Sequence, residues 1–166
     1  MIIRDVLPSE LAHVAELRVA AYQAGGFLSE DSEYAATLRA LGTAGDGQVL
    51  VTVAGDRIVG TAMLQPWPHA GRVVRTPDEA EIRALAVAPD QQRAGIARDL
   101  VAAVIARALE AGVRHLVLFT QPEMRAARRL YEGFGFLRLP ERDWAPSPGV
   151  LLLAYGLPLT SDPVVR

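Results

Sequence analysis

Residues 92–97, Gln-Arg-Ala-Gly-Ile-Ala, combine small side chains and positive charge directly after an apolar run over 82–87. A helical pattern begins around Gly95. The start of a helix offers unpaired backbone N–H groups and a partial positive charge, and glycine lets a ligand approach them closely. Arg93 and Arg98 add full positive charges on either side. We therefore expect this turn to bind a phosphate group.

Two flanking segments strengthen this interpretation: Glu-Ile-Arg-Ala-Leu-Ala-Val-Ala-Pro over 81–89, and Ala-Arg-Arg-Leu-Tyr-Glu-Gly-Phe-Gly-Phe over 127–136. With the turn, they resemble the GNAT superfamily of acyl-CoA-dependent N-acetyltransferases across residues 79–139. The resemblance implies that acetyl-CoA lays its pantetheine arm along the strand at 81–87 and its pyrophosphate on the turn. It assigns the cofactor to Leu85, Ala86, Val87, Gln92, Arg93, Ala94, Gly95, Ile96, Ala97 and Arg98.

Tyr131 is the expected general acid. When an amine attacks a thioester, the tetrahedral intermediate expels a thiolate, and a phenol with a reference pKa of ~10 is protonated at neutral pH and can supply its proton. In the resembling family a tyrosine at this position does so. The alternative is a core tyrosine, since Tyr131 shares a helical stripe with Ala127, Leu130 and Phe134.

Glu81 is the expected base, because the attacking amine is mostly protonated at pH 7 and must lose a proton. Some members of the resembling family carry a glutamate here, and others use solvent or backbone. Glu79 shares the strand face and is the second candidate. The alternative is that both glutamates only pair with Arg83 or Arg57. The oxyanion is expected to rest on backbone N–H near Leu85.

One position departs from the family pattern. Many members have Asn three residues before the alanine that matches Ala127, where it bonds the pantetheine or its pyrophosphate end. Met124 stands there in this chain and can offer apolar contact only. Arg128 and Arg129 are candidates for the 3′-phosphate, with surface solvation as the alternative for at least one of them.

The acceptor is expected to meet loops at 24–31, 65–76 and 141–148. Phe27, Tyr34 and Trp67, together with Trp144, could line an aromatic pocket, and Glu30 or Asp31 could attract a cationic amine. Packing or surface roles are the alternative for each. The length of these loops favours a small amine or an amino-acid-like acceptor over a protein tail.

Bulk composition narrows the function classes. The 166 residues are 51% apolar, which suits one domain over 1–160 with a tail at 161–166. A net charge of −2 gives no reason to expect nucleic acid or an anionic membrane as partner. Without cysteine there is no disulfide, thiol nucleophile or thiolate metal site, and the three scattered histidines predict no metal. No leader pattern is evident, so we expect a cytoplasmic protein.

Periodicity predicts an α/β domain with a mixed sheet, in the order β-α-α-β-β-β-α-β-α-β-β that the GNAT fold also has. A helix is expected from Pro8 with Ser9 as N-cap, and a second over 29–41. The strands at 81–87 and 115–120 should be parallel across a helix over 95–110. The remaining expected strands and helix lie at 2–6, 48–54, 57–65, 125–134, 136–139 and 150–156.

These features together predict an N-acetyltransferase that moves an acetyl group from acetyl-CoA to a primary amine of a small molecule or peptide. Transfer should be direct within a ternary complex, because no cysteine can hold an acyl intermediate. The alternatives are a non-catalytic acyl-CoA-binding sensor or regulatory module, and an α/β interaction domain that binds no CoA. Homodimerisation through the C-terminal strands is left open.

Overall fold

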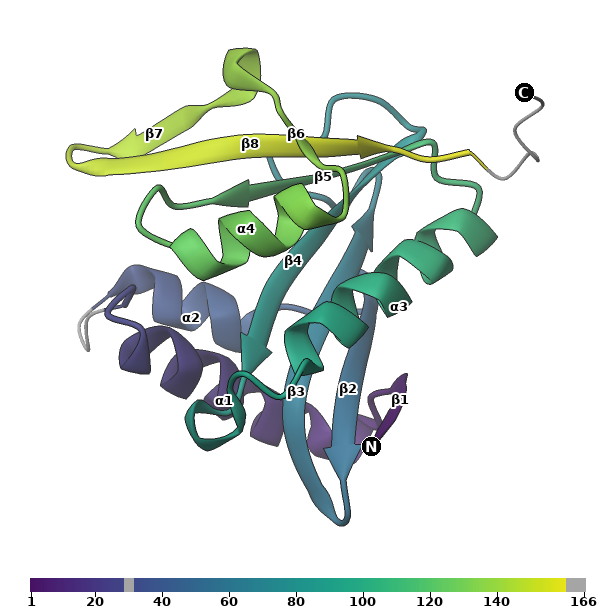
Figure 1. Cartoon of the computed structure of the whole chain (residues 1–166), viewed down its shortest axis with the longest axis vertical. Helices are drawn as coiled ribbons and strands as arrows, with labels where there is room; N and C mark the ends of the chain where they lie inside the picture. Colours follow the sequence, from purple (N-terminus) through teal and green to yellow (C-terminus); the bar gives the residue numbers. More distant parts are fainter. Residues whose placement is uncertain (29–31, 161–166) are drawn as a thin grey trace. The chain divides into compact units, whose positions relative to one another are not determined.

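The computed structural model describes residues 1–28 and 32–160 (Figure 1). The chain divides into two compact units, the first made of Met1–Gln65 with Ile82–Val104 and the second of Pro66–Glu81 with Ile105–Arg166. Strand β4 (Glu79–Val87) and helix α3 (Ile96–Glu110) contribute residues to both. A single domain over 1–160 stays a prediction.

The first unit is built on antiparallel strands. In spatial order they are β1 (Ile2–Asp5), β2 (Gln48–Ala54), β3 (Arg57–Pro66) and β4. Four consecutive residues of β2, Val49 to Thr52, are buried, so both faces of this β-branched strand are covered. Gly55 has φ +64 in the predicted two-residue turn between β2 and β3.

Helices α1 (Leu11–Ala24) and α2 (Glu33–Ala40) pack against each other in the first unit. The predicted N-cap at Ser9 is wrong. A 3₁₀ turn, η1 (Pro8–Glu10), precedes α1, and Glu10 Oε1 accepts the Leu7 N–H at 2.8 Å. The Glu10 carboxylate thus closes the start of the 3₁₀ turn, and Glu10, the N-cap residue of α1, makes no side-chain capping bond to that helix.

Helix α2 begins later than the range expected for it, 29–41. Its N-cap is Ser32, whose hydroxyl oxygen accepts the Tyr34 N–H at 3.1 Å. The first part of the expected range, 29–31, lies outside the described residues, and so do the acceptor candidates Glu30 and Asp31.

The second unit is organised around β5 (His115–Thr120), which runs parallel to the start of β4 and antiparallel to β8 (Val150–Pro158). Its other elements are α4 (Arg125–Gly133), β6 (Leu137–Arg138) and β7 (Trp144–Ser147). Both β6 and β7 pair with β8, which Figure 1 shows as the long yellow strand. The parallel β4–β5 pair across α3 is confirmed, with Glu79 opposite His115.

Strand β7 was not predicted, because residues 141–148 read as a loop. Pro146 argues against a central strand, yet it is tolerated here in a short strand whose ladder partner is β8. Two further short 3₁₀ turns, η2 (Pro89–Gln91) and η3 (Pro140–Arg142), lie in the connections. The remaining order matches, and the mixed α/β class is confirmed.

Candidate functional site

The predicted phosphate turn lies in the first unit between β4 and α3. Residues 92–95 are exposed, and the backbone is left-handed at Arg93 (φ +68) and again at Gly95 (φ +80). Helix α3 begins at Ile96, and Asp99 N–H donates to Gly95 C=O at 3.0 Å. The amides just before Asp99 have no carbonyl one turn earlier inside the helix. The turn therefore presents N–H groups on an exposed loop with no bulky side chain at Gly95.

This turn is anchored at its base to β3. Both guanidinium Nη atoms of Arg57 bond the carboxylate of Asp90 in η2 at 2.8 Å, and the Ala88 N–H donates to Val59 C=O at 2.8 Å. A Cβ on Gly60 would lie only 2.7 Å from Ile96 Cγ2. Only glycine therefore lets the first turn of α3 approach β3 this closely.

The strand segment expected to hold the pantetheine arm has an irregular backbone. Ala84 has φ +54 within β4, a conformation that costs a non-glycine residue on the order of 1–3 kcal/mol and that is concentrated at functional sites. Leu85 and Val87 are half-buried, whereas Ala86 is buried. Residues 85–87 thus directly follow a local break in the regular strand.

Glu81, the expected base, is in the second unit and lies opposite Val117 in the parallel β4–β5 ladder. Its side chain is 4% exposed, and Oε1 accepts the Gly71 N–H at 2.9 Å. Gly71 belongs to the connection between β3 and β4. One carboxylate oxygen is thereby oriented by a loop backbone, a contact that the sequence did not suggest.

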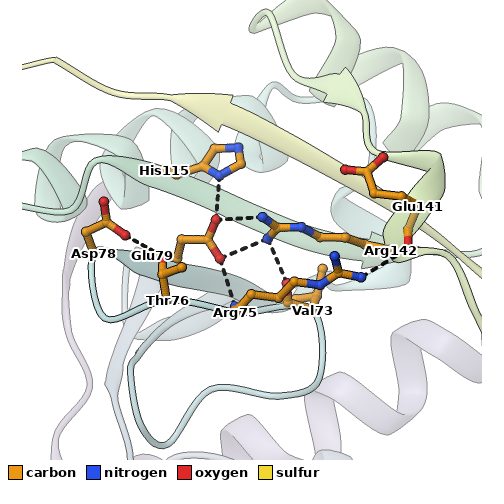
Figure 2. Close-up of polar contacts among 8 residues, drawn as sticks. All are labelled: Val73, Arg75, Thr76, Asp78, Glu79, His115, Glu141 and Arg142. Atoms are coloured by element: carbon orange, nitrogen blue, oxygen red, sulfur yellow. Dashed lines mark hydrogen bonds and ion pairs between the residues drawn. The ribbon is translucent and has the colours of Figure 1, made fainter.

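Glu79 has a different environment, shown in Figure 2. Its two carboxylate oxygens accept from the Arg142 Nη1 and Nη2 atoms at 2.8 and 2.9 Å and from the Arg75 N–H at 2.8 Å, and Oε2 lies 2.7 Å from His115 Nδ1. Burial would raise the pKa of Glu79, but these donors lower it to about 2. The expected partners, Arg83 and Arg57, are thus replaced by Arg142 and His115.

Tyr131 lies on α4 in the second unit, 7% exposed, with its ring centroid 5.6 Å from that of Phe136. Burial raises the pKa of Tyr131 above its ordinary value, so the phenol holds its proton at neutral pH. The geometry agrees with both readings of this residue, a packed core tyrosine and a proton donor.

Met124 is the N-cap residue of α4, and its sulfur accepts a 3.5 Å hydrogen bond from the Thr120 hydroxyl. Arg128, a candidate for the 3′-phosphate, donates from Nε to the Tyr155 hydroxyl at 3.2 Å and from Nη1 to Pro122 C=O at 3.1 Å. These contacts tie Arg128 to its own unit.

The aromatic candidates for the acceptor pocket are divided between the units. In the first unit the Phe27 ring lies over Gly25, and the Tyr34 ring is 6.2 Å from that of Tyr22. In the second unit Trp67 is 45% exposed, while the Trp144 ring is 6.2 Å from that of Phe119 and has the Arg72 guanidinium 4.7 Å from its centroid. A shared aromatic wall stays a prediction.

The described part of the chain has neither a metal-binding cluster nor a membrane-spanning helix. Residues 1–28 and 32–160 hold no group of three or more metal-ligating side chains that could bind an ion. Across the same ranges, no helix is both long and apolar enough to span a bilayer.

Comparison with known proteins gives a consistent family assignment. The model of the acetyltransferase (GNAT) family matches residues 11–136. Mycothiol acetyltransferase from Kocuria rhizophila is 34% identical over 83 residues, which are 50% of this chain but only 26% of that protein. This chain therefore matches about a quarter of that relative's length.

Solved structures share the fold. A GNAT-family protein from Desulfovibrio desulfuricans superposes with a TM-score of 0.75 at 24% identity, covering 95% of this chain and 98% of the other. A Salmonella typhimurium protein solved with its cofactor acetyl-CoA gives 0.69 at 21%, covering 100% and 98%. The ribosomal-protein-S18-alanine N-acetyltransferase from Escherichia coli gives 0.69 at 20%, covering 99% of both chains.

Proposed function

This chain belongs to the acetyltransferase (GNAT) family, and on that premise we propose that it transfers an acetyl group from acetyl-CoA to a primary amine of a small molecule or peptide. The observation that carries the proposal is the exposed turn over 92–95, left-handed at Arg93 and Gly95 and followed directly by the start of α3. Such a turn suits a diphosphate, because it offers several backbone N–H groups at the positive end of a helix dipole.

Acetyl-CoA supplies the thioester in this proposal, and the chain's own residues bind it and move protons. Gln92 to Arg98 hold the pyrophosphate, and the backbone of Leu85 to Val87 holds the pantetheine arm. The amine nitrogen attacks the thioester carbonyl and forms a C–N bond. The tetrahedral intermediate then breaks its C–S bond, and the Tyr131 hydroxyl gives a proton to the departing sulfur.

Glu81 takes the proton that the amine must lose, directly or through water. The surroundings of Glu79 support this choice: Glu79 is bound by Arg142, the Arg75 amide and His115, whereas the Gly71 N–H orients Oε1 of Glu81. A carboxylate held by an arginine, a histidine ring nitrogen and a backbone amide is a poor proton acceptor, since these donors lower the pKa of Glu79 to about 2.

For the acceptor, we propose a primary amine of a small or short molecule. Among the relatives, one is named mycothiol acetyltransferase and another ribosomal-protein-S18-alanine N-acetyltransferase, so small molecules and protein or peptide termini are both acceptor classes to test. Both classes belong in the same search. The chain has no lysine, since all seventeen of its Lys and Arg residues are arginine. Acetyl-lysine detected on a peptide acceptor therefore cannot come from the enzyme itself.

The test is acetyl-CoA-dependent thiol release over a panel of amines, amino acids and short peptides, with wild type and Tyr131→Phe side by side. The chain contributes no thiol background, since it has no cysteine. We expect Tyr131→Phe to slow transfer by about 10²-fold while leaving acetyl-CoA affinity nearly unchanged. Calorimetric titration with acetyl-CoA measures that affinity.

Equal turnover by Tyr131→Phe and wild type would overturn the general-acid assignment and favour a core role for this tyrosine. Acetyl-CoA binding with no turnover on any acceptor would instead favour the acyl-CoA-binding sensor. Failure to bind acetyl-CoA at all would contradict the cofactor site and leave an interaction domain.

A further inference from the structure

Arg18, on α1 in the first unit, is the most deeply buried charged side chain for which the proposed reaction has no use. It is 1% exposed and lies among the buried residues of α1. Its Nη1 atom donates to the Leu38 and Leu41 carbonyl oxygens at 2.9 and 2.8 Å, at the end of α2. These two bonds fix the plane and direction of the guanidinium group.

The other edge of the same guanidinium has no partner. Nε and Nη2 are buried, and neither has a hydrogen bond to any residue in 1–28 or 32–160. Buried donors are nearly always satisfied in proteins, so a buried cation with two unpaired donor nitrogens requires an explanation. Nε–H and one Nη2–H point in parallel from one edge, which matches the two oxygens of a carboxylate.

The surroundings of Arg18 suit a single negative charge. Burial lowers the pKa of Arg18 to about 10. Smaller electrostatic effects from Tyr22, Tyr34 and Asp46 raise this pKa, and the charge of Arg83 lowers it. The guanidinium therefore stays charged at pH 7. The two carboxylate oxygens of Asp46 accept hydrogen bonds from the Gly42 N–H and from Gln65 Nε2, at 3.1 and 2.9 Å. It is not hydrogen-bonded to Arg18, and its charge disfavours a dianion such as phosphate nearby.

One of the predicted acceptor contacts, Tyr34, lies among the residues around Arg18. Tyr22 follows Arg18 by one helical turn on α1, and its ring pairs with that of Tyr34, one of the predicted acceptor contacts, on α2. Arg83 stands on β4 two residues after Glu81, and its Nη1 donates to Gln65 Oε1 at 3.1 Å. The first unit thus gathers two arginines and two tyrosines from α1, α2 and β4.

We propose that the Nε/Nη2 edge of Arg18 binds a carboxylate group of the acceptor, so that the substrates of this enzyme are amines that also carry a carboxylate. This inference rests on the proposed function only in taking the ligand to be the acetyl acceptor. Carboxylate binding at Arg18 does not itself depend on catalysis. Because both nitrogens are buried, side chains near them must move to admit the ligand. A small carboxylate alone should therefore bind weakly, with a Kd on the order of millimolar.

The test is a titration followed by NMR of the arginine Nε–H groups, with propionate as ligand and propionamide as its uncharged match. We expect propionate to shift the Arg18 Nε–H resonance saturably and propionamide to leave it in place. Arg18→Lys should weaken propionate binding at least about tenfold, measured by calorimetry, because an ammonium lacks the parallel pair of donors. Arg39→Gln is the matched control: Arg39 lies on α2 and binds Glu16 at 2.9 Å, and its loss should change nothing.

Equal responses to propionate and propionamide, no response to either, or tighter binding of inorganic phosphate would overturn the proposal. Circular dichroism will show whether Arg18→Lys folds. If it does not, the comparison of propionate with propionamide on the wild-type protein still tests the proposal. The two proposals fail separately: an enzyme that acetylates amines but ignores propionate refutes only the carboxylate site. A protein that binds propionate at Arg18 but releases no thiol refutes only the acetyltransferase.

Discussion

Glu81 and Glu79 lie two residues apart on β4, and they have different hydrogen-bond partners. Glu79 is bound on both oxygens by Arg142 and also by His115 and a backbone amide. Glu81 is oriented through Oε1 by the Gly71 N–H. Because its donors favour the charged form and lower the pKa of Glu79 to about 2, Glu79 is a poor proton acceptor. Glu81 therefore stays the predicted base.

We expect Glu81→Gln to lower kcat by about 10²-fold at pH 7, because the amide keeps the shape of the side chain but cannot take a proton. The deficit should shrink as the pH rises toward the pKa of the acceptor amine, where the amine is already neutral. A pH–rate profile of thiol release measures both effects. A constant deficit at every pH would contradict the role of base and indicate a structural one.

At the scale of elements, the phosphate turn depends on a short loop and on the helix that follows it. Gly95 has φ +80, and a Cβ there would meet nothing within 4 Å. Gly55, in the β2–β3 turn, has φ +64 and equally open space. Substitutions at these two glycines therefore carry the same kind of backbone strain, and only one of them lies at the proposed phosphate site.

Gly95→Glu is expected to abolish acetyl-CoA binding, because it places a carboxylate where the pyrophosphate should rest. Gly55→Glu, with comparable strain, should bind acetyl-CoA like wild type. Calorimetric titration of both variants decides the matter. Normal binding by Gly95→Glu, or equal losses in the two variants, would mean that the cofactor site is elsewhere.

The element scale also shows where sequence patterns were sufficient. The β4–turn–α3–β5 unit was predictable because an apolar run, a glycine and a helical stripe follow one another, and both propensity and periodicity favour the same elements. The start of α1 was not, because the pattern around Ser9 does not reveal that a 3₁₀ turn, closed by the Glu10 carboxylate on the Leu7 N–H, precedes the helix. Strand β7 was missed because Pro146 suits a loop equally well.

At the scale of the whole molecule, the charges buried around Glu79 tie stability to pH. Burial alone would raise the pKa of Glu79 above 4.5, yet Arg142, the Arg75 amide and His115 lower it to about 2. A carboxyl whose pKa is lowered on folding stabilises the folded state while it is ionised. That contribution is complete above about pH 4.5 and is lost as the pH falls toward 2.

We therefore expect the free energy of unfolding to decrease between about pH 4.5 and 2, and Glu79→Gln to flatten this limb. At pH 7, Glu79→Gln should cost about 3 kcal/mol, because it leaves the half-buried Arg142 without its counter-ion. Urea denaturation at a series of pH values provides the measurement. Parallel acid limbs in wild type and variant would show that other carboxylates govern acid unfolding.

Across the molecule, sequence reasoning was strongest for motifs that are local in the chain and weakest for contacts between distant segments. Nothing near Glu79 in the sequence points to Arg142 or His115, which only the pairing of β4 with β5 and the placement of η3 bring to it. Arg18 likewise looks like an ordinary helix residue in the sequence, and only the packing of α2 against α1 buries it and gives it the Leu38 and Leu41 carbonyls as partners. The partners of these buried charged residues are set by tertiary structure alone.

The exposed turn that begins α3 has one more consequence, for proteolysis. Trypsin cuts this lysine-free chain only after arginine, and Arg93 lies on exposed backbone rather than inside a helix or strand. If acetyl-CoA rests on this turn, it shields the Arg93–Ala94 peptide bond, and at ten times its Kd it should slow that cleavage about tenfold. Cleavage after exposed Arg75, in the other unit, should keep its rate. Mass spectrometry of the digest would then locate the cofactor without any knowledge of the acceptor.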